Sequence, residues 1–218
     1  MDRKAKGVIF DMDGVLFDTE RIFQGFWKDI AAERGIDLGE DFVSTITGTN
    51  GKLLLSIVEK YYQVYDGRAI RDEVIRRIDD YLTREVPIKK GVINMLGYLK
   101  EKGIRTAIAS SSPTDLIISN LKVSGTTDYF DIIVSGKEVE KGKPSPDIFL
   151  LAASRLDLDC KDCIIFEDSF NGIRAAHSSG AITIMIPDLI QPTEEIKSLT
   201  DGIYQDFDAF LEDKDKYF

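Results

Sequence analysis

The stretch from Lys6 to Asp18, KGVIFDMDGVLFD, constrains the fold more than any other part of the 218-residue chain. Its apolar run at residues 8–10 is β-branched and aromatic, which is typical of a buried strand in a parallel sheet. The run ends at Asp11 and Asp13, two carboxylates one residue apart. Because a buried unpaired charge is costly, both side chains must lie where the strand leaves the core. We therefore expect them at the carboxyl end of the first strand, in the crevice where open α/β sheets bind ligands.

Carboxylates at a strand end are compatible with three roles: nucleophile, metal ligand and turn former. Asp and Gly are ordinary turn residues, so Asp11, Asp13 and Gly14 by themselves also fit a simple turn. In either case Gly14 lets the backbone turn sharply after the strand. The short pattern D-x-D therefore does not decide between a site and a turn.

The charge balance limits the partners that this chain can bind. Lys and Arg total 28 against 38 Asp and Glu, a net charge of −10, which argues against a nucleic-acid-binding surface. An acidic protein that handles phosphate must collect positive charge locally. A divalent cation and one or two well-placed lysines would supply it.

Size and hydropathy indicate an ordinary globular protein, since 43% of the residues are hydrophobic and 30% are charged. No apolar run approaches the roughly 18 residues that a membrane-spanning helix needs. The first six residues lead straight into the first predicted strand and leave no room for a signal peptide. We therefore expect a cytoplasmic protein with no membrane partner, monomeric or weakly oligomeric.

Cys160 and Cys163 form a single C-x-x-C pair. A redox role would need a lowered thiol pKa at the start of a helix, whereas Cys163 opens a predicted strand. No second pair completes a zinc site, and His177, the only histidine, lies in a helical segment. We interpret both cysteines as structural.

The rhythm of apolar residues divides the chain into two parts. From residue 17 to about 86 it is helical throughout, which favours a separate bundle, although outer helices of one domain would give the same pattern. From residue 91 helices alternate with short apolar strands, which implies a parallel sheet with right-handed crossovers. The predicted strands are 104–109, 131–134, 163–166 and 181–186, and the predicted helices 91–102, 113–123, 146–156, 171–179 and 206–212, with a loop after 187. We predict an α/β, Rossmann-like core of residues 1–16 and 87–218, with residues 17–86 inserted as a helical cap.

Three serines follow the predicted strand 104–109. Ser112 suits the N-cap of the next helix and Pro113 its first position. Ser110 then lies at the strand end with its hydroxyl free, beside the amides of a helix N-terminus, where an anion can bind. The alternative is that all three serines serve only as capping and loop residues.

A lysine-rich segment precedes the helix predicted from residue 146, with Ser145 as N-cap and Pro146 at the first helical position. Lys137, Lys141 and Lys143 all compete for a role in a site. Lys143 is the best placed, because the proline that follows keeps it extended on a stiff approach to the helix.

Glu167 and Asp168 repeat the pattern of the first strand, since an apolar run again ends in paired carboxylates. The sequence alone does not decide which of them binds a metal ion. Asp168, with the shorter side chain further from the strand, is the better candidate ligand, and Glu167 is placed to orient a neighbour.

Together these segments resemble a known family. The string DMDGVLFDTE, residues 11–20, resembles the first motif of the haloacid dehalogenase superfamily of phosphatases and phosphomutases. Ser110, Lys143 and the Glu167-Asp168 pair are similar to its second, third and fourth motifs, in the family order. The inserted helices and the string EDSFNGIRAA resemble the helical-cap subgroup, which includes β-phosphoglucomutase and phosphoglycolate-phosphatase-like enzymes. The resemblance covers nearly the whole chain.

The resemblance implies a role for each motif residue. Asp11 would attack phosphorus and form an aspartyl-phosphate, and Asp13 would protonate the leaving oxygen and then activate water. Asp11, the Asp13 backbone carbonyl and Asp168 would hold Mg²⁺, which suits an oxygen-only ligand set. An aspartate at position 13 argues against a dehalogenase, which by the family pattern lacks it.

The phosphoryl oxygens would be neutralised by the Ser110 hydroxyl, the Ser111 amide and the Lys143 ammonium, again by resemblance. We therefore expect a Mg²⁺-dependent phosphatase that acts on a small phosphorylated metabolite such as a sugar phosphate.

The predicted cap bears on the choice between phosphatase and mutase. Gly51 and Phe23 stand where the β-phosphoglucomutase cap carries an Arg and a His, which lowers the case for a mutase. The candidate substrate contacts are Thr19, which the family keeps on the hinge side, and Asn50 and Lys52 of the loop 47–52. A sugar phosphomutase is the second reading. A catalytically silent module that binds a phospholigand or a protein is the third, and the four intact motifs argue against it.

Overall fold

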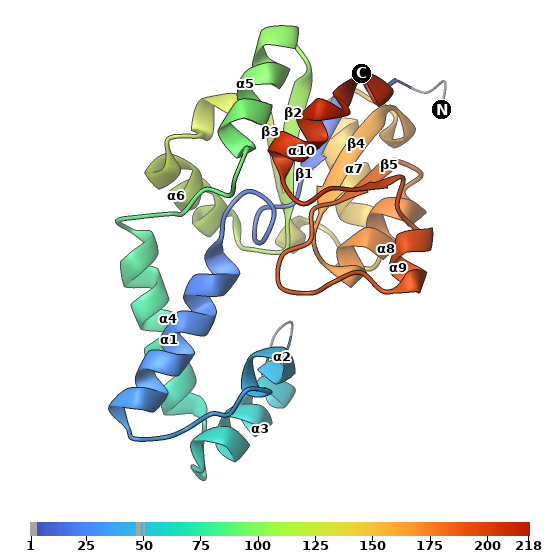
Figure 1. The fold of residues 1–218 in the computed structure, drawn as a ribbon. Coiled ribbons are helices and arrows are strands. Elements are labelled where there is room, and N and C mark those ends of the chain that lie inside the picture. The colour runs from blue at the N-terminus through green and yellow to red at the C-terminus, as the bar shows by residue number, and fades with distance from the viewer. Residues whose placement is uncertain (1–3, 47–48, 50) are drawn as a thin grey trace. The chain divides into compact units, whose positions relative to one another are not determined.

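The structure is a computed structural model that describes residues 4–46, 49 and 51–218. The chain divides into two compact units, which Figure 1 draws as ribbons. One unit comprises Met1–Asp18 and Val86–Phe218, and we call it the sheet unit. The other is Thr19–Glu85, the helical unit. Among the described residues, no helix is both long and apolar enough to span a bilayer.

The sheet unit contains one six-stranded parallel sheet with the strand order β3-β2-β1-β4-β5-β6. Its strands are β1 (Gly7–Phe10), β2 (Arg105–Ser110), β3 (Ile132–Ser135), β4 (Cys163–Glu167), β5 (Ile182–Met185) and β6 (Gly202–Ile203). The predicted α/β class with a parallel sheet is therefore confirmed. The strand order reverses between β1 and β4, and at such a switch point open α/β sheets have their ligand crevice.

Helices cover the sheet and bury both of its faces (Figure 1). They are α5 (Val92–Lys102), α6 (Thr114–Ser124), α7 (Asp147–Arg155), α8 (Phe170–Ser178), α9 (Glu194–Ser198) and α10 (Phe207–Glu212). Ile9 and Ile165 pack in one apolar cluster with Phe149 of α7. Phe10 and Phe166 point to the other face and stack with their ring centroids 5.3 Å apart. This burial on both faces explains why β1 is apolar throughout.

The helical unit consists of α1 (Thr19–Glu33), α2 (Phe42–Ile46), α3 (Gly51–Tyr62) and α4 (Arg68–Leu82), and its described residues include no strand. It has its own aromatic core, in which Trp27 contacts Phe42 and Tyr62 edge to face. The Tyr62 hydroxyl donates to the Trp27 carbonyl. The predicted cap, residues 17–86, differs from this unit by two residues at its start and one at its end.

The N-caps predicted for two helices are wrong, and each of these helices starts one residue later than predicted. α6 begins at Thr114 with Pro113 in extended conformation as its N-cap, and α7 begins at Asp147 after Pro146. Ser112 and Ser145 each lie one residue before the N-cap, and their hydroxyls donate to Asp13 and Asp147.

The loop predicted after residue 187 is also wrong, since α9 and β6 lie there. The side chain of Thr193 caps α9 by accepting from the backbone N–H of Ile196. Both elements are too short, at five and two residues, for periodicity to reveal them.

Candidate active site

Polar side chains gather at the carboxyl ends of β1, β2 and β4. Phe10 pairs in register with Ile108 on one side and Phe166 on the other. Asp11, the next residue, donates its backbone N–H to the Phe166 carbonyl over 3.0 Å. This register places Asp11 beside the end of β4, where Glu167 is the last strand residue. The sheet thus brings together residues that the sequence separates by more than 150 positions.

Lys143 is the cation of this cluster. Its Nζ contacts Asp11 Oδ1, lies 2.6 Å from Glu167 Oε1 and donates to the Ala109 carbonyl over 3.2 Å. The side chains of Lys143, Asp11 and Glu167 are only 8%, 10% and 1% exposed. Of the three competing lysines, Lys143 is therefore the one that reaches this strand edge, while Lys137 and Lys141 are exposed.

Both oxygens of Glu167 have hydrogen-bond donors. Oε1 accepts from Lys143, and Oε2 accepts from the backbone N–H groups of Asp168 and Ser169 at 2.9 Å and from the Ser169 hydroxyl at 3.0 Å. Glu167 therefore orients the turn that carries Asp168. Gly172 leaves the space for it, because a Cβ there would lie 1.8 Å from Glu167 Oε1.

Asp168 lies against the turn that follows β1. A Cβ on Gly14 would come within 2.3 Å of Asp168 Oδ2, and Gly14 has a φ of +82°. Only glycine tolerates both the close approach of Asp168 and this positive φ. The close approach explains how the carboxylates of the first and fourth strands share one site.

Burial governs the electrostatics of these carboxylates. It raises the pKa of Asp11 to about 7, since the opposing Lys143 ammonium only partly offsets it and Glu167 and Asp13 add to the rise. Burial, then the charges of Glu167 and Asp11, raises the pKa of Asp168 well above its usual value. Burial also disfavours the charged form of Lys143, but Asp11 and Glu167 outweigh it and raise its pKa.

The charge balance of this cluster fits a divalent cation. Asp11 and Glu167 are buried carboxylates that share one ammonium, that of Lys143, and the half-buried Asp168 adds a third carboxyl group whose pKa their charges raise. Across residues 4–46, 49 and 51–218, no three His, Cys, Asp or Glu side chains are grouped as for a metal ion. The predicted set needs only two, because its third ligand is the Asp13 backbone carbonyl. Its all-oxygen composition suits Mg²⁺.

Asp13 and the serines at the carboxyl end of β2 form the other side of the site. The Ser112 hydroxyl donates to Asp13 Oδ2 over 2.9 Å. Ser110 is buried and its Oγ accepts from the Ser112 backbone N–H at 3.1 Å, so its hydroxyl oxygen is already an acceptor rather than free. Ser111 is exposed between them.

The remaining predicted contacts belong to the helical unit or fall outside the description. Thr19 is buried at the start of α1, and Lys52 is exposed in the first turn of α3. Asn50 lies outside the described residues. Cys160 and Cys163 are both buried and free, and burial raises the pKa of the Cys163 thiol to about 12, which agrees with a structural role.

Sequence reasoning missed the ion pair of Lys89 and Asp188, whose Nζ and Oδ1 lie 2.6 Å apart. Their side chains are 15% and 1% exposed. The signal that could have found it is the position of Asp188 just after a predicted strand, as with Asp11 and Asp168. Its charge also contributes to the raised pKa of Asp168.

Comparison with known proteins places the chain among phosphate-handling hydrolases. The family model of haloacid dehalogenase-like hydrolases matches residues 8–186. The phosphorylated carbohydrates phosphatase of Thermotoga maritima is 34% identical over 180 residues, covering 80% of this chain and 82% of that protein. Hexitol phosphatase B of Escherichia coli is 28% identical over 190 residues, covering 85% of each.

Two solved structures have a similar fold. A haloacid dehalogenase family hydrolase from Deinococcus radiodurans, with bound phosphate and sodium, superposes with a TM-score of 0.84 at 25% identity over 98% of each chain. CbbY from Rhodobacter sphaeroides, in complex with phosphate, gives a TM-score of 0.71 at 26% identity and covers 93% of this chain and 95% of its own.

Proposed function

The chain belongs to the haloacid dehalogenase-like hydrolases, and we propose that it hydrolyses the phosphate monoesters of small metabolites, above all sugar phosphates, with Mg²⁺. The observation that carries the proposal is the buried contact of Lys143 with Asp11 and Glu167 at the switch point of the sheet. Relatives named as a phosphorylated carbohydrates phosphatase and a hexitol phosphatase support a sugar phosphate as substrate.

The reaction would proceed in two steps on the residues of the strand ends. A carboxylate oxygen of Asp11 attacks phosphorus and the bond to the leaving oxygen breaks, while Asp13 gives that oxygen its proton. Water then attacks the aspartyl-phosphate, its proton passes to Asp13, and inorganic phosphate leaves Asp11.

Positive charge has to favour the ionised form of Asp11, because burial raises its pKa. Lys143 contributes by direct contact, and with the Ser110 hydroxyl and the Ser111 amide it would receive the phosphoryl oxygens. When bound to Asp11, Asp168 and the Asp13 carbonyl, Mg²⁺ would supply further positive charge to the same oxygens.

We also propose that the helical unit, Thr19–Glu85, is the cap of this family and carries substrate selectivity. Thr19, Asn50 and Lys52 are its candidate contacts. Because the unit has its own core, its surface residues can change without altering the sheet unit.

A screen of phosphorylated metabolites with Mg²⁺, read out as released phosphate, tests the proposal. We expect release from one or more sugar phosphates by the wild-type protein and none by the Asp11→Asn variant prepared in parallel. Equal release by both would contradict the proposed nucleophile. Binding of a phosphorylated compound without turnover would favour the silent-module reading.

Magnesium is expected to raise the melting temperature by several degrees, and by more at about pH 8 than at about pH 5.5. The pKa of Asp11 is raised from 3.8 to about 7 in the folded state, so the folded protein loses stability as the pH rises from about 4 to about 7 and Asp11 ionises. A bound cation offsets that cost, whereas protons compete with it at lower pH. Thermal unfolding with Mg²⁺ or with chelator measures the difference.

The Asp168→Asn variant is the control for this measurement, since it removes one of the two carboxylate ligands. Its magnesium-dependent shift should be largely lost at both pH values. An unchanged shift in this variant, or a wild-type shift independent of pH, would contradict the assigned ligand set.

The choice between hydrolysis and isomerisation rests on Lys52. A mutase must hold a second phosphate far from Asp11, for which a bidentate Arg is suited and a single Lys is a weaker substitute. We expect phosphate release to exceed isomerisation for any hexose phosphate. Lys52→Ala should raise KM for sugar phosphates about fivefold with kcat changed less than about twofold.

Kinetics that follow glucose 6-phosphate and free phosphate from β-glucose 1-phosphate, with the bisphosphate activator present, decide this point. Lys60→Ala, another exposed lysine in α3, is the matched control and should change neither constant. Isomerisation much faster than phosphate release would establish a mutase instead.

A further inference from the structure

Each of the three polar groups of Ser112 holds a defined hydrogen bond. Its backbone N–H donates to Ser110 Oγ at 3.1 Å, and its backbone carbonyl accepts from Ser135 Oγ at 2.6 Å. Its own hydroxyl donates to Asp13 Oδ2 at 2.9 Å. Ser112 is therefore fixed from two sides and bonded to the proposed acid on a third.

The two serines that hold Ser112 are themselves rigidly placed. Ser110 ends β2 and Ser135 ends β3, and the two are partners in the parallel ladder. Both side chains are buried, at 1% and 0% exposed. The neighbouring turn is close-packed as well, because a Cβ on Gly136 would lie 3.1 Å from the Ser111 Cα. The position of the Ser112 hydroxyl is therefore set by the sheet.

We propose that Ser112 is a positioning residue for Asp13 and fixes which carboxyl oxygen carries the catalytic proton. This inference rests on the proposed function, in which Asp13 is the general acid. A hydroxyl can donate to a carboxylate oxygen and equally to the carbonyl oxygen of a neutral carboxyl group. The bond to Oδ2 can thus persist throughout the reaction, and on this proposal Oδ1 is the oxygen that gives the proton to the leaving oxygen.

Holding Asp13 in this position affects only the step in which the bond between phosphorus and the leaving oxygen breaks. As the bond between phosphorus and the leaving oxygen breaks, the proton passes from Asp13 Oδ1 to that oxygen, and an alcohol departs while Asp13 becomes a carboxylate. An alkoxide is a poor leaving group and needs this proton, whereas p-nitrophenolate is a stable anion and departs without it. Loss of the Ser112 hydroxyl should therefore slow the release of alcohols selectively.

The test compares kcat/KM for an alkyl phosphate, glycerol 2-phosphate or a sugar phosphate found in the screen, with that for p-nitrophenyl phosphate. This constant reports steps up to leaving-group departure, so the later water step does not obscure the comparison. Ser112→Ala should lower it about 30-fold for the alkyl phosphate and less than about 3-fold for p-nitrophenyl phosphate. Ser112→Thr keeps the hydroxyl and should restore the alkyl phosphate rate to within about 3-fold.

Ser135→Ala provides a second, independent variant, because it releases the Ser112 carbonyl without touching Asp13. It should show the same selectivity with a smaller loss, about 5-fold on the alkyl phosphate. Ser124→Ala, at the other end of α6 and bonded to Thr126, is the control and should leave both constants unchanged.

Equal losses on both substrates in Ser112→Ala, or no loss on either, would overturn the inference while leaving the proposed function intact. A Thr variant as slow as the Ala variant on the alkyl phosphate would also overturn it. If the wild-type protein hydrolyses neither substrate, the proposed function fails, and the inference that depends on it fails too.

Discussion

Replacing Asp11 with asparagine is expected to lower phosphate release about 10⁴-fold or more while the protein stays folded. The amide has nearly the same shape as the carboxylate but cannot act as the nucleophile. Folding should survive, because Lys143 keeps Glu167 as a partner at 2.6 Å and one costly buried charge is removed. The measurements are steady-state phosphate release and thermal unfolding of the two proteins side by side.

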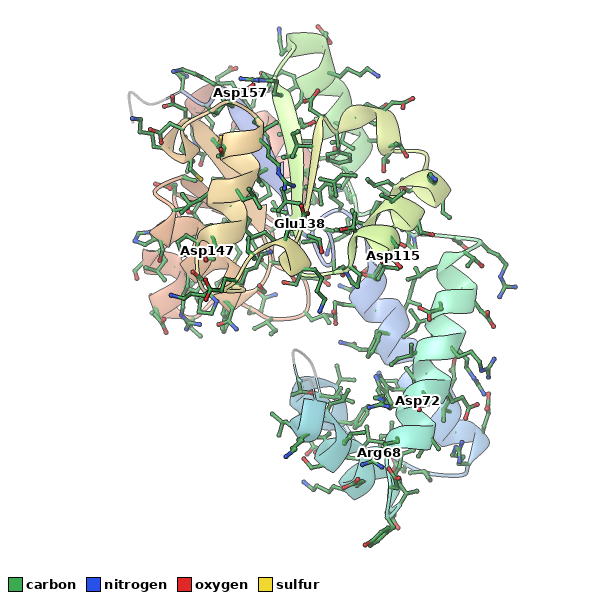
Figure 2. All side chains as sticks on the ribbon, turned by 180° about the vertical axis from the view of Figure 1, so that it is seen from behind. Arg68, Asp72, Asp115, Glu138, Asp147 and Asp157 are labelled. Carbon is green, nitrogen blue, oxygen red and sulfur yellow. The ribbon has the colours of Figure 1, made fainter. Side chains whose placement is uncertain are left out.

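The matched control is Asp157→Asn, the same substitution at a side chain that is 89% exposed. Figure 2 shows Asp157 and Asp147 at opposite ends of α7, and Asp147 opens the helix at the strand edge that carries the site. Asp157→Asn should therefore leave turnover unchanged. Rapid quenching during turnover, followed by peptide mapping, should place a phosphoryl group on Asp11. A phosphoryl group on any other residue would contradict the mechanism.

Much of this site could be predicted from the sequence, because its residues follow short apolar strands. Asp11 directly follows such a strand and Glu167 is the last residue of another. Parallel strands bring these ends to one edge of the sheet. The position of Lys143 before a proline distinguished it from two other lysines, and the structure shows that Lys143 reaches Asp11.

Partners far apart in the sequence could not be predicted. Ser112 and Asp13 are 99 positions apart, as are Lys89 and Asp188, and no local pattern encodes either contact. The N-cap expected at Ser112 is wrong as well, since α6 starts one residue later with Pro113 as its N-cap, and the Ser112 hydroxyl donates to the distant Asp13. Strand ends follow from local periodicity, whereas the choice of hydrogen-bond partner depends on the assembled sheet.

Lys143→Met is expected to destabilise the protein by about 3 kcal/mol or more and to lower kcat/KM about 10³-fold. The variant leaves Asp11 and Glu167, 10% and 1% exposed, with no ammonium between them. The Lys143 charge lowers the pKa of Asp11, so its loss raises that pKa further. Protonation then relieves the carboxyls at low pH, and the destabilisation should be larger at about pH 8 than at about pH 5. Urea unfolding at both pH values measures it.

The double variant Lys143→Met/Glu167→Gln separates two roles of Lys143: it neutralises Glu167, and it supplies positive charge beside Asp11. The glutamine carries no charge, and its amide oxygen can still accept from the N–H groups of Asp168 and Ser169. It should recover at least half of the lost unfolding free energy, because only Asp11 is left as a carboxylate without its ammonium. Activity should stay low, since the cation that contacts Asp11 is still missing. If turnover returned along with stability, Lys143 would serve only to neutralise Glu167, and another group would have to supply the positive charge for phosphoryl transfer.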